Sequence, residues 1–281
     1  DDVVIEARVE MINRRLGTDI AKEDMIAYFK NLGLKVEDGE VLRVEIPSYR
    51  QGLKEEVDLI EEVGRLYGFH NIKTRPLRGD LSRGEKPYFR VIEDRSKEIL
   101  SGMGLSEILT YSFISPKSYD LTRLPEDSKL RKSASLLNPL GQDYSVMRTS
   151  LISNMLETIS RNYNRKIEEV LFYEIGNVFV AQELPVVNMP LEKRTLVVGG
   201  YGSLDFYKLK EILTILLDRL GISEVDIRRE SENTSFHPGR TGVISLDGQD
   251  FGIVGEIHPD VLGNYNIKTR VYMAELDYDV V

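Results

Sequence analysis

Residues 47–72 decide the fold of the N-terminal part of the chain, and they read PSYRQGLKEEVDLIEEVGRLYGFHNI. The proline and serine that open the stretch end whatever element precedes them. Hydrophobic residues then recur at steps of three and four, which is the period of an amphipathic helix. They are Leu53, Val57, Ile60, Val63 and Tyr67. Gly68 stands where a glycine commonly follows the last helical turn, so the stretch predicts one helix ending there.

The other side of this predicted helix carries the carboxylates Asp58, Glu61 and Glu62. Their spacing places the Cβ atoms about 5–6 Å apart, and such close acids repel one another unless a cation lies among them. One interpretation is therefore a metal site. The other is a set of surface ion pairs, because Lys54 lies four residues before Asp58 and Arg65 lies four residues after Glu61. Spacing alone favours the ion pairs.

The composition is that of an ordinary globular protein. The chain has 281 residues, of which 41% are hydrophobic and 30% charged, and its net charge is −9. This length allows two domains. The absence of cysteine excludes disulfides, thiolate metal sites and cysteine nucleophiles, and the histidines lie too far apart in sequence to favour a zinc site. An acidic chain does not attract nucleic acid through its net charge, so any basic patch must be local.

The sequence shows neither a signal peptide nor an apolar run of the roughly 20 residues that span a membrane. A cytoplasmic location is therefore expected. The first residue is Asp1 rather than methionine, which indicates a piece of a longer protein.

The pattern predicts two α+β domains, residues 1–76 and 87–281, joined by a linker at 77–86 that is rich in glycine and charge. In the first domain we expect an edge strand at 3–7, a helix ending at Gly33, and a hairpin around Asp38-Gly39 before the helix described above. This order has the outline of a winged-helix module.

The second domain is predicted to be a mostly antiparallel sheet interrupted by helices. We expect helices at 88–103, 151–164 and 205–220. Strands are expected at 108–114, 136–138, 170–180, 194–199, 225–229, 241–246, 251–257 and 270–276.

Two short motifs invite chemical interpretations. Gly200-Tyr201-Gly202 precedes a predicted helix, as in dinucleotide-binding loops, but Asp205 stands where a third glycine is needed and would repel a pyrophosphate. His237-Pro238-Gly239-Arg240 places a base beside an arginine that is suited to anions. A rigid turn entering a strand is the favoured explanation of that second motif.

The motifs PSYR, DLIEEV and YG of residues 47–68 resemble the signature of the B5 domain of phenylalanine–tRNA ligase beta subunits. The remaining resemblance runs in the family's order through nearly the whole chain. It comprises Asn138-Pro139, Met147-Arg148-Thr149-Ser150-Leu151, Glu174-Ile175-Gly176, Asp205-Phe206-Tyr207, His237-Pro238-Gly239-Arg240 and Glu256-Ile257-His258-Pro259.

The resemblance implies a B5 domain followed by a catalytic-like domain with a class II synthetase-like antiparallel sheet. It also implies an enzyme of two alpha and two beta subunits that joins phenylalanine to its tRNA with ATP and magnesium, the active site being in the alpha subunit. This chain would be a scaffold with no catalytic or cofactor-binding residue of its own. Helix 88–103 and strand 108–114 would contact the alpha subunit.

Asp58, Glu61 and Glu62 match three ligands of the family's magnesium site, which the resemblance implies is shared with the alpha subunit. The fourth ligand, an aspartate in the family, falls on Gly52, so a weak or empty site is expected in this chain. Arg148 lies near the position of the first class II arginine, but no Gly-x-Gly-x-x-Arg follows it, which favours a structural or interfacial role.

The alternative to the scaffold is a free-standing nucleic-acid-binding module with a winged-helix-like head. A basic stripe would distinguish this alternative. Residues 1–83 instead carry 17 acidic and 14 basic side chains.

Overall fold

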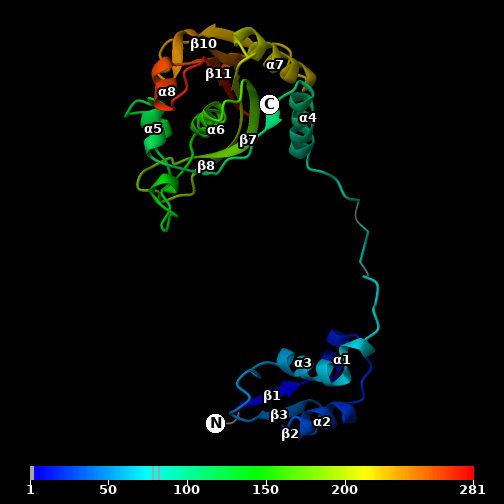
Figure 1. The fold of residues 1–281 in the computed structure, drawn as a ribbon. Coiled ribbons are helices and arrows are strands. Elements are labelled where there is room, and N and C mark those ends of the chain that lie inside the picture. The colour runs from blue at the N-terminus through cyan, green and yellow to red at the C-terminus, as the bar shows by residue number, and fades with distance from the viewer. Residues whose placement is uncertain (1–2, 78, 82) are drawn as a thin grey trace. The chain divides into compact units, whose positions relative to one another are not determined.

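The computed structural model describes residues 3–77, 79–81 and 83–281. The chain divides into two compact units, Asp1–Arg83 and Gly84–Val281 (Figure 1), and the described residues of each pack around hydrophobic cores of their own. In the described part of the chain, no helix has both the length and the apolar character needed to cross a membrane.

The first unit is a three-stranded antiparallel sheet in the order β1-β3-β2, covered by helices. Its elements are β1 (Val3–Ala7), α1 (Val9–Leu16), α2 (Lys22–Asn31), β2 (Lys35–Glu37), β3 (Leu42–Ile46), α3 (Glu56–Tyr67) and a 3₁₀ turn (Phe69–Asn71). The edge strand and the hairpin around Asp38-Gly39 are confirmed.

Helix α3 ends as predicted, with the Gly68 N–H donating to the Gly64 carbonyl at 3.0 Å. Its buried side differs from the expectation in one residue. Leu59 is fully buried, whereas Val57 is 59% exposed. The stripe that reaches the core passes through Leu59, Ile60 and Val63, and the 100° step per residue therefore turns Val57 toward solvent.

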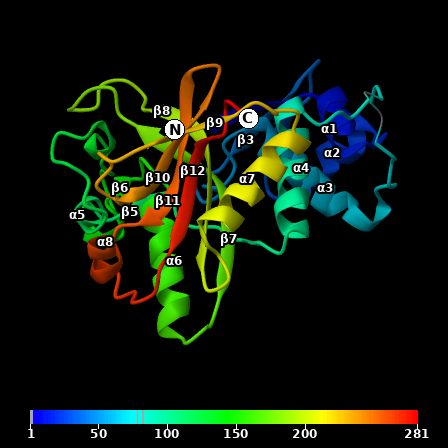
Figure 2. The same cartoon turned by 90° about the horizontal axis from the view of Figure 1, so that it is seen from above.

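The second unit is built on a seven-stranded sheet in the order β4-β7-β8-β12-β11-β10-β9 (Figure 2). All pairs are antiparallel except β4 with β7. Its strands are β4 (Ser106–Glu107), β7 (Val170–Val180), β8 (Leu191–Tyr201), β9 (Asp226–Arg229), β10 (Phe236–Leu246), β11 (Gln249–Ile257) and β12 (Tyr272–Asp277); β5 (Phe113–Ile114) and β6 (Val146–Met147) pair separately.

The sheet curves around α6, while α4 and α7 cover its other face (Figure 1). Alternation along the strands supplies both cores: Leu196 and Val198 pack on the α7 side, and Val197 packs on the α6 side. The helices are α4 (Tyr88–Gly102), α5 (Lys117–Leu121), α6 (Ile152–Asn164), α7 (Phe206–Arg219) and α8 (Pro259–Asn264), with 3₁₀ turns at Lys129–Arg131 and Gln142–Tyr144.

The prediction of one strand over 108–114 is wrong, because only Phe113–Ile114 is a strand there. The Ile108 N–H donates to the Tyr173 carbonyl at 2.8 Å, but the Thr110 hydroxyl then donates to the Glu174 carboxylate at 2.7 Å. The hydrogen bond of the Thr110 side chain thus takes the place of the backbone pairing that a strand would make, and the residue between positions 108 and 110 points outward. Leu109 is 83% exposed.

The strand predicted at 136–138 is also absent from the described residues, where an isolated bridge joins Ser135 to Val146 instead. Pro139 lacks the N–H that continued pairing requires, so the chain leaves as a loop.

Candidate functional site

Asp58 acts on the backbone at the start of α3. Its Oδ2 accepts the N–H groups of Lys54 at 2.7 Å and Glu55 at 2.8 Å, forming a capping box. These two backbone hydrogen bonds, Lys54's first, lower the pKa of Asp58. Because a capping carboxylate satisfies N–H groups that the helix leaves unpaired, the orientation of Asp58 follows from local structure.

Glu62 is held by two guanidinium groups, those of Arg65 at 2.6 Å and Arg50 at 3.1 Å. Burial by itself raises the pKa of Glu62, but the hydrogen bonds from Arg65 and Arg50 outweigh it and lower that pKa. The expected pairing of Arg65 with Glu61 is therefore wrong: Arg65 reaches the acid three residues before it, and Glu61 is exposed.

The three carboxylates, as arranged, do not fit a magnesium site by themselves. Magnesium requires near-octahedral oxygen ligands at about 2.0–2.1 Å. Asp58 gives an oxygen to the helix start, and Glu62 is occupied by Arg50 and Arg65. Nowhere in residues 3–77, 79–81 and 83–281 do three histidine, cysteine or acidic side chains gather so that they could hold a metal ion.

Arg148 lies in a buried ion pair. Its Nη1 is 2.8 Å from Glu174 Oε1, and the two side chains are only 3% and 2% exposed. Nε of Arg148 also donates to the Asn177 carbonyl at 2.8 Å, and Nη1 donates to the Thr110 hydroxyl at 2.9 Å. A Cβ on Gly176 would lie 2.4 Å from Nη2 of the same guanidinium. Two motifs 26 residues apart thus form one structural unit.

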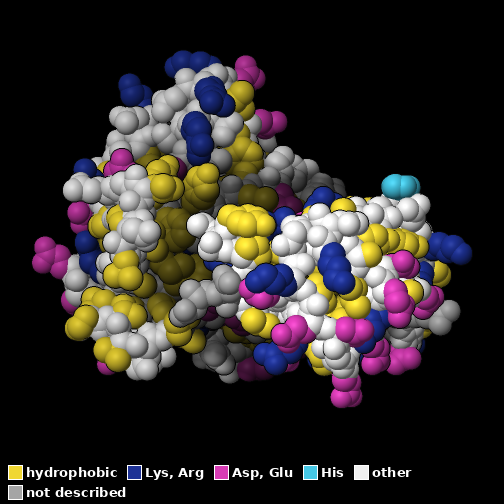
Figure 3. Space-filling model, turned by 90° about the horizontal axis from the view of Figure 1, so that it is seen from below, with side chains coloured by type: hydrophobic (Ala, Val, Ile, Leu, Met, Phe, Trp, Pro, Cys, Tyr) yellow, Lys and Arg dark blue, Asp and Glu magenta, His cyan; other side chains and the backbone are white. Residues whose placement is uncertain are grey.

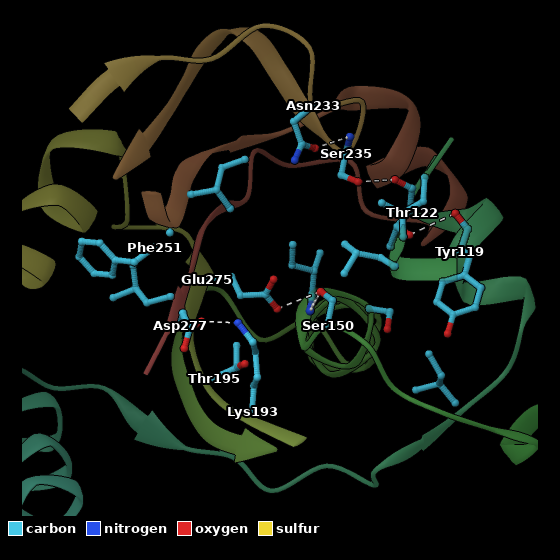
Figure 4. A pocket seen from close by; sticks show the side chains of 18 residues that line it. Tyr119, Thr122, Ser150, Lys193, Thr195, Asn233, Ser235, Phe251, Glu275 and Asp277 are labelled. Atoms are coloured by element: carbon cyan, nitrogen blue, oxygen red, sulfur yellow. Dashed lines mark hydrogen bonds and ion pairs between the residues drawn. The ribbon is translucent and has the colours of Figure 1, made fainter. Parts of the chain in front are cut away.

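A cavity of about 300 Å³ lies over the sheet at the N-terminal end of α6 (Figure 4). Glu275 of β12 borders it and accepts the Leu151 N–H at 2.6 Å and the Ser150 hydroxyl at 2.9 Å. Beside it, Lys193 pairs with Asp277 at 2.8 Å. Burial raises the pKa of Glu275. Glu275 was not predicted from the sequence, since a single glutamate on an alternating strand belongs to no motif.

Glu275→Gln is expected to gain stability relative to the parent chain as pH rises. The raised pKa means that the folded state favours the protonated carboxyl. The parent chain therefore loses stability when Glu275 ionises. This loss is absent below the unfolded-state pKa, and it grows as pH rises through the folded-state pKa. Glutamine keeps an acceptor for the Leu151 N–H and removes the charge. Melting temperatures at about pH 5 and about pH 8 test this; a difference between the two chains that is the same at both pH values contradicts it.

The two motifs with chemical interpretations are parts of the sheet. Gly200-Tyr201-Gly202 runs off the end of β8, and a Cβ on Gly200 would lie 2.0 Å from the Val170 carbonyl oxygen of β7. His237 to Arg240 lies within β10 rather than in a turn before it, at an irregularity in its pairing with β11.

Two family models cover the chain. The model of the tRNA synthetase B5 domain matches residues 5–69, and the model of the phenylalanyl-tRNA synthetase beta chain CLM domain matches residues 72–278. The chain belongs to the phenylalanyl-tRNA synthetase beta chain family. The family predicted from the sequence motifs is therefore confirmed.

Relatives named phenylalanine–tRNA ligase beta subunit support the membership. The one from Clostridium tetani is 41% identical over 96% of this chain and 34% of its own length. The one from Clostridium acetobutylicum is 38% identical over 99% of this chain and 35% of its own length. The chain thus spans about a third of the length of these beta subunits.

The fold is that of a synthetase. Pyrrolysyl-tRNA synthetase from Desulfitobacterium hafniense aligns with a TM-score of 0.57 at 15% identity, covering 92% of this chain and 88% of that one. At this identity the likeness concerns the fold alone. It confirms the predicted α+β, class II synthetase-like architecture of this beta-chain segment.

Proposed function

We propose that the chain is a scaffold within phenylalanine–tRNA ligase, with residues 1–76 as its B5 domain, 77–86 as a linker and 87–281 as its catalytic-like domain. The observation that carries the scaffold role is the buried ion pair of Arg148 with Glu174. Phosphoryl chemistry requires several positive groups around the phosphates. The Arg148 guanidinium is paired with the Glu174 carboxylate and is buried, so it is unsuited to binding phosphates.

The active site then belongs to an alpha subunit, in an enzyme of two alpha and two beta subunits that uses ATP and magnesium, acts on tRNA and works in the cytoplasm. The relatives from Clostridium tetani and Clostridium acetobutylicum are phenylalanine–tRNA ligase beta subunits, which supports this assignment.

Co-expression with the alpha subunit of a clostridial relative tests the proposal. We expect the two chains to co-purify in equal amounts, and phenylalanine-dependent ATP–pyrophosphate exchange only in samples that contain the alpha subunit. Exchange by the isolated chain, or failure of the two chains to associate, contradicts the proposal.

Helix α4 supports an interface with that subunit. Its inner side packs on the core through Leu100, which is buried, and through Ile92 and Ile99, which are partly buried. Its outer side leaves Tyr88 and Val91 exposed, and Phe89 lies under the Arg194 guanidinium at 4.9 Å. On the face seen in Figure 3, hydrophobic side chains gather in patches between charged ones. We propose that the outer side of α4 contacts the alpha subunit.

The variant Tyr88→Asp/Val91→Asp is expected to weaken alpha-subunit binding at least about tenfold, because the charges would be desolvated in the interface. Stability should be unchanged, since both side chains are exposed. Val187→Asp/Met189→Asp, which adds two charges at other exposed hydrophobic residues, is the control. Titration of the fluorescently labelled alpha subunit gives the dissociation constants; equal values for all three chains rule out this interface.

We further propose that Asp58, Glu61 and Glu62 bind magnesium weakly in this chain, in a site shared with the alpha subunit. A Cβ added to Gly52 would have no neighbouring atom within 4 Å, so an aspartate fits there. Gly52→Asp is expected to tighten magnesium binding several-fold by adding one carboxylate. Gly79→Asp adds the same charge in the linker and is the control. Calorimetry decides: tight binding by the present sequence, or no gain from Gly52→Asp, counts against the shared site.

A further inference from the structure

A groove of about 730 Å³ lies where the N-terminal end of α7 meets β9, β10 and the start of β12. Five cationic residues, three aromatic residues and one acid contribute to its lining. They are Lys210, Arg228, Arg229, Arg240, Arg270, Phe206, Tyr207, Tyr272 and Asp205.

The cations of the groove are only partly neutralised. Glu256 serves both Arg240, at 2.7 Å, and Arg270, at 3.8 Å. Arg228 pairs with Asp250. Across the described ranges, neither Lys210 nor Arg229 has an ion-pair partner, and both are exposed. The groove is thus a positive site in a chain whose net charge is −9.

Asp205, the acid in the lining, repels a bound anion less than a free carboxylate would. Asp205 is the N-cap of α7, and its Oδ1 accepts the Lys208 N–H at 2.8 Å. Its charge is therefore directed at the backbone of the helix. The repulsion predicted for Asp205 concerned a pyrophosphate on the helix terminus, whereas Lys210 lies more than one turn further along α7.

Tyr207 offers an aromatic face beside these cations. Tyr207 is 80% exposed, although exposed aromatic residues are costly in solvent. Phe206 supports it edge-on, with 6.0 Å between ring centroids and 85° between planes. Flat aromatic faces next to cations are the usual platform for single-stranded nucleic acid, on which bases stack while phosphates meet lysine and arginine.

We propose that this groove binds an unpaired stretch of RNA, with a base stacked on Tyr207 and phosphates at Lys210 and Arg229. The inference deepens the proposed function and rests on it only for the identity of the RNA as tRNA. The groove belongs to the catalytic-like unit, whereas the winged-helix-like first unit is net acidic.

Fluorescence anisotropy with a labelled oligouridine of about 12 nucleotides tests the proposal on the purified chain. Binding should weaken with salt. Lys210→Gln/Arg229→Gln should reduce the slope of log K against log salt by about 1.4, since each lost phosphate contact contributes about 0.7 for a single strand. Lys129→Gln/Lys132→Gln removes two charges from exposed lysines elsewhere in the same unit and should leave the slope unchanged.

Two variants of Tyr207 test whether a base stacks on its ring. Tyr207→Ala should weaken oligouridine binding roughly tenfold, and Tyr207→Phe should bind as the parent chain does. Lack of binding by the parent chain overturns the proposal. So does equal binding of a duplex of the same length, displacement by uridine monophosphate at equal phosphate concentration, or insensitivity to both sets of substitutions.

Alpha-subunit binding, measured on the same variants, separates this inference from the proposed function. Absence of RNA binding by the parent chain with intact subunit association refutes the groove alone. Absence of association with intact RNA binding refutes the scaffold role and leaves the groove in place.

Discussion

Arg148→Met is expected to destabilise the second unit by about 3–5 kcal/mol, because it leaves the Glu174 charge buried without its partner. Glu174 is 2% exposed and would keep only the hydrogen bonds from Thr110. The cost should appear in the free energy of opening of β7, where Glu174 lies. Urea-dependent hydrogen exchange of the β7 amides measures that free energy.

Two further variants make this result specific. Arg148→Met/Glu174→Leu should recover part of the loss, since removing both charges removes the unpaired one. Arg90→Met breaks a surface pair with Glu93, in which the arginine is 57% exposed, and should cost less than about 1 kcal/mol. If Arg148→Met cost no more than Arg90→Met, the guanidinium would be free for another role, and the scaffold argument would fail.

Gly200→Ala is expected to destabilise the same unit by about 3 kcal/mol, at the upper end for an overpacked site. The new Cβ would lie 2.0 Å from the Val170 carbonyl oxygen, which belongs to the backbone of β7. That oxygen cannot move away unless β7 separates from β8. The two strands are paired over eleven residue pairs. Hydrogen exchange in β7 and β8 again gives the free energy.

Gly102→Ala is the matched control for Gly200→Ala. It lies at the end of α4 with no atom within 4 Å of the added Cβ, so stability should stay the same or rise by up to about 1 kcal/mol. Unchanged stability in Gly200→Ala would contradict the packing explanation and restore the interpretation of residues 200–202 as a ligand loop.

Most regular elements were predictable because their signals are local. Strand 170–180 was predicted with both of its ends, and the helix after Asp205 begins at the residue following that cap. The helix ending at Gly68 follows from hydrophobic period and a terminal glycine. Motif order also identified the family, which the two family models confirm.

The errors arose where a distant residue competes with local preference. The β-rich segment 108–114 was expected to be one strand, but the buried Arg148–Glu174 pair engages Thr110 and bends it. Helical spacing places both Glu61 and Glu62 within reach of Arg65. Arg65 pairs with Glu62, which Arg50 also contacts, and the position of Arg50 is known only from the structure.

The sequence by itself determined the order of helices and strands, the two-part organisation expected for the chain and the family, since each depends on residues close together along the chain. Only the tertiary structure decided the sites. Ser150 meets Glu275 across 125 positions, and the basic groove draws on α7, β9, β10 and β12. Several of these residues stand in sequence motifs, but no motif shows which segments meet in space. Burial and charge act through space, so their chemistry exists only once the sheet has brought the segments together.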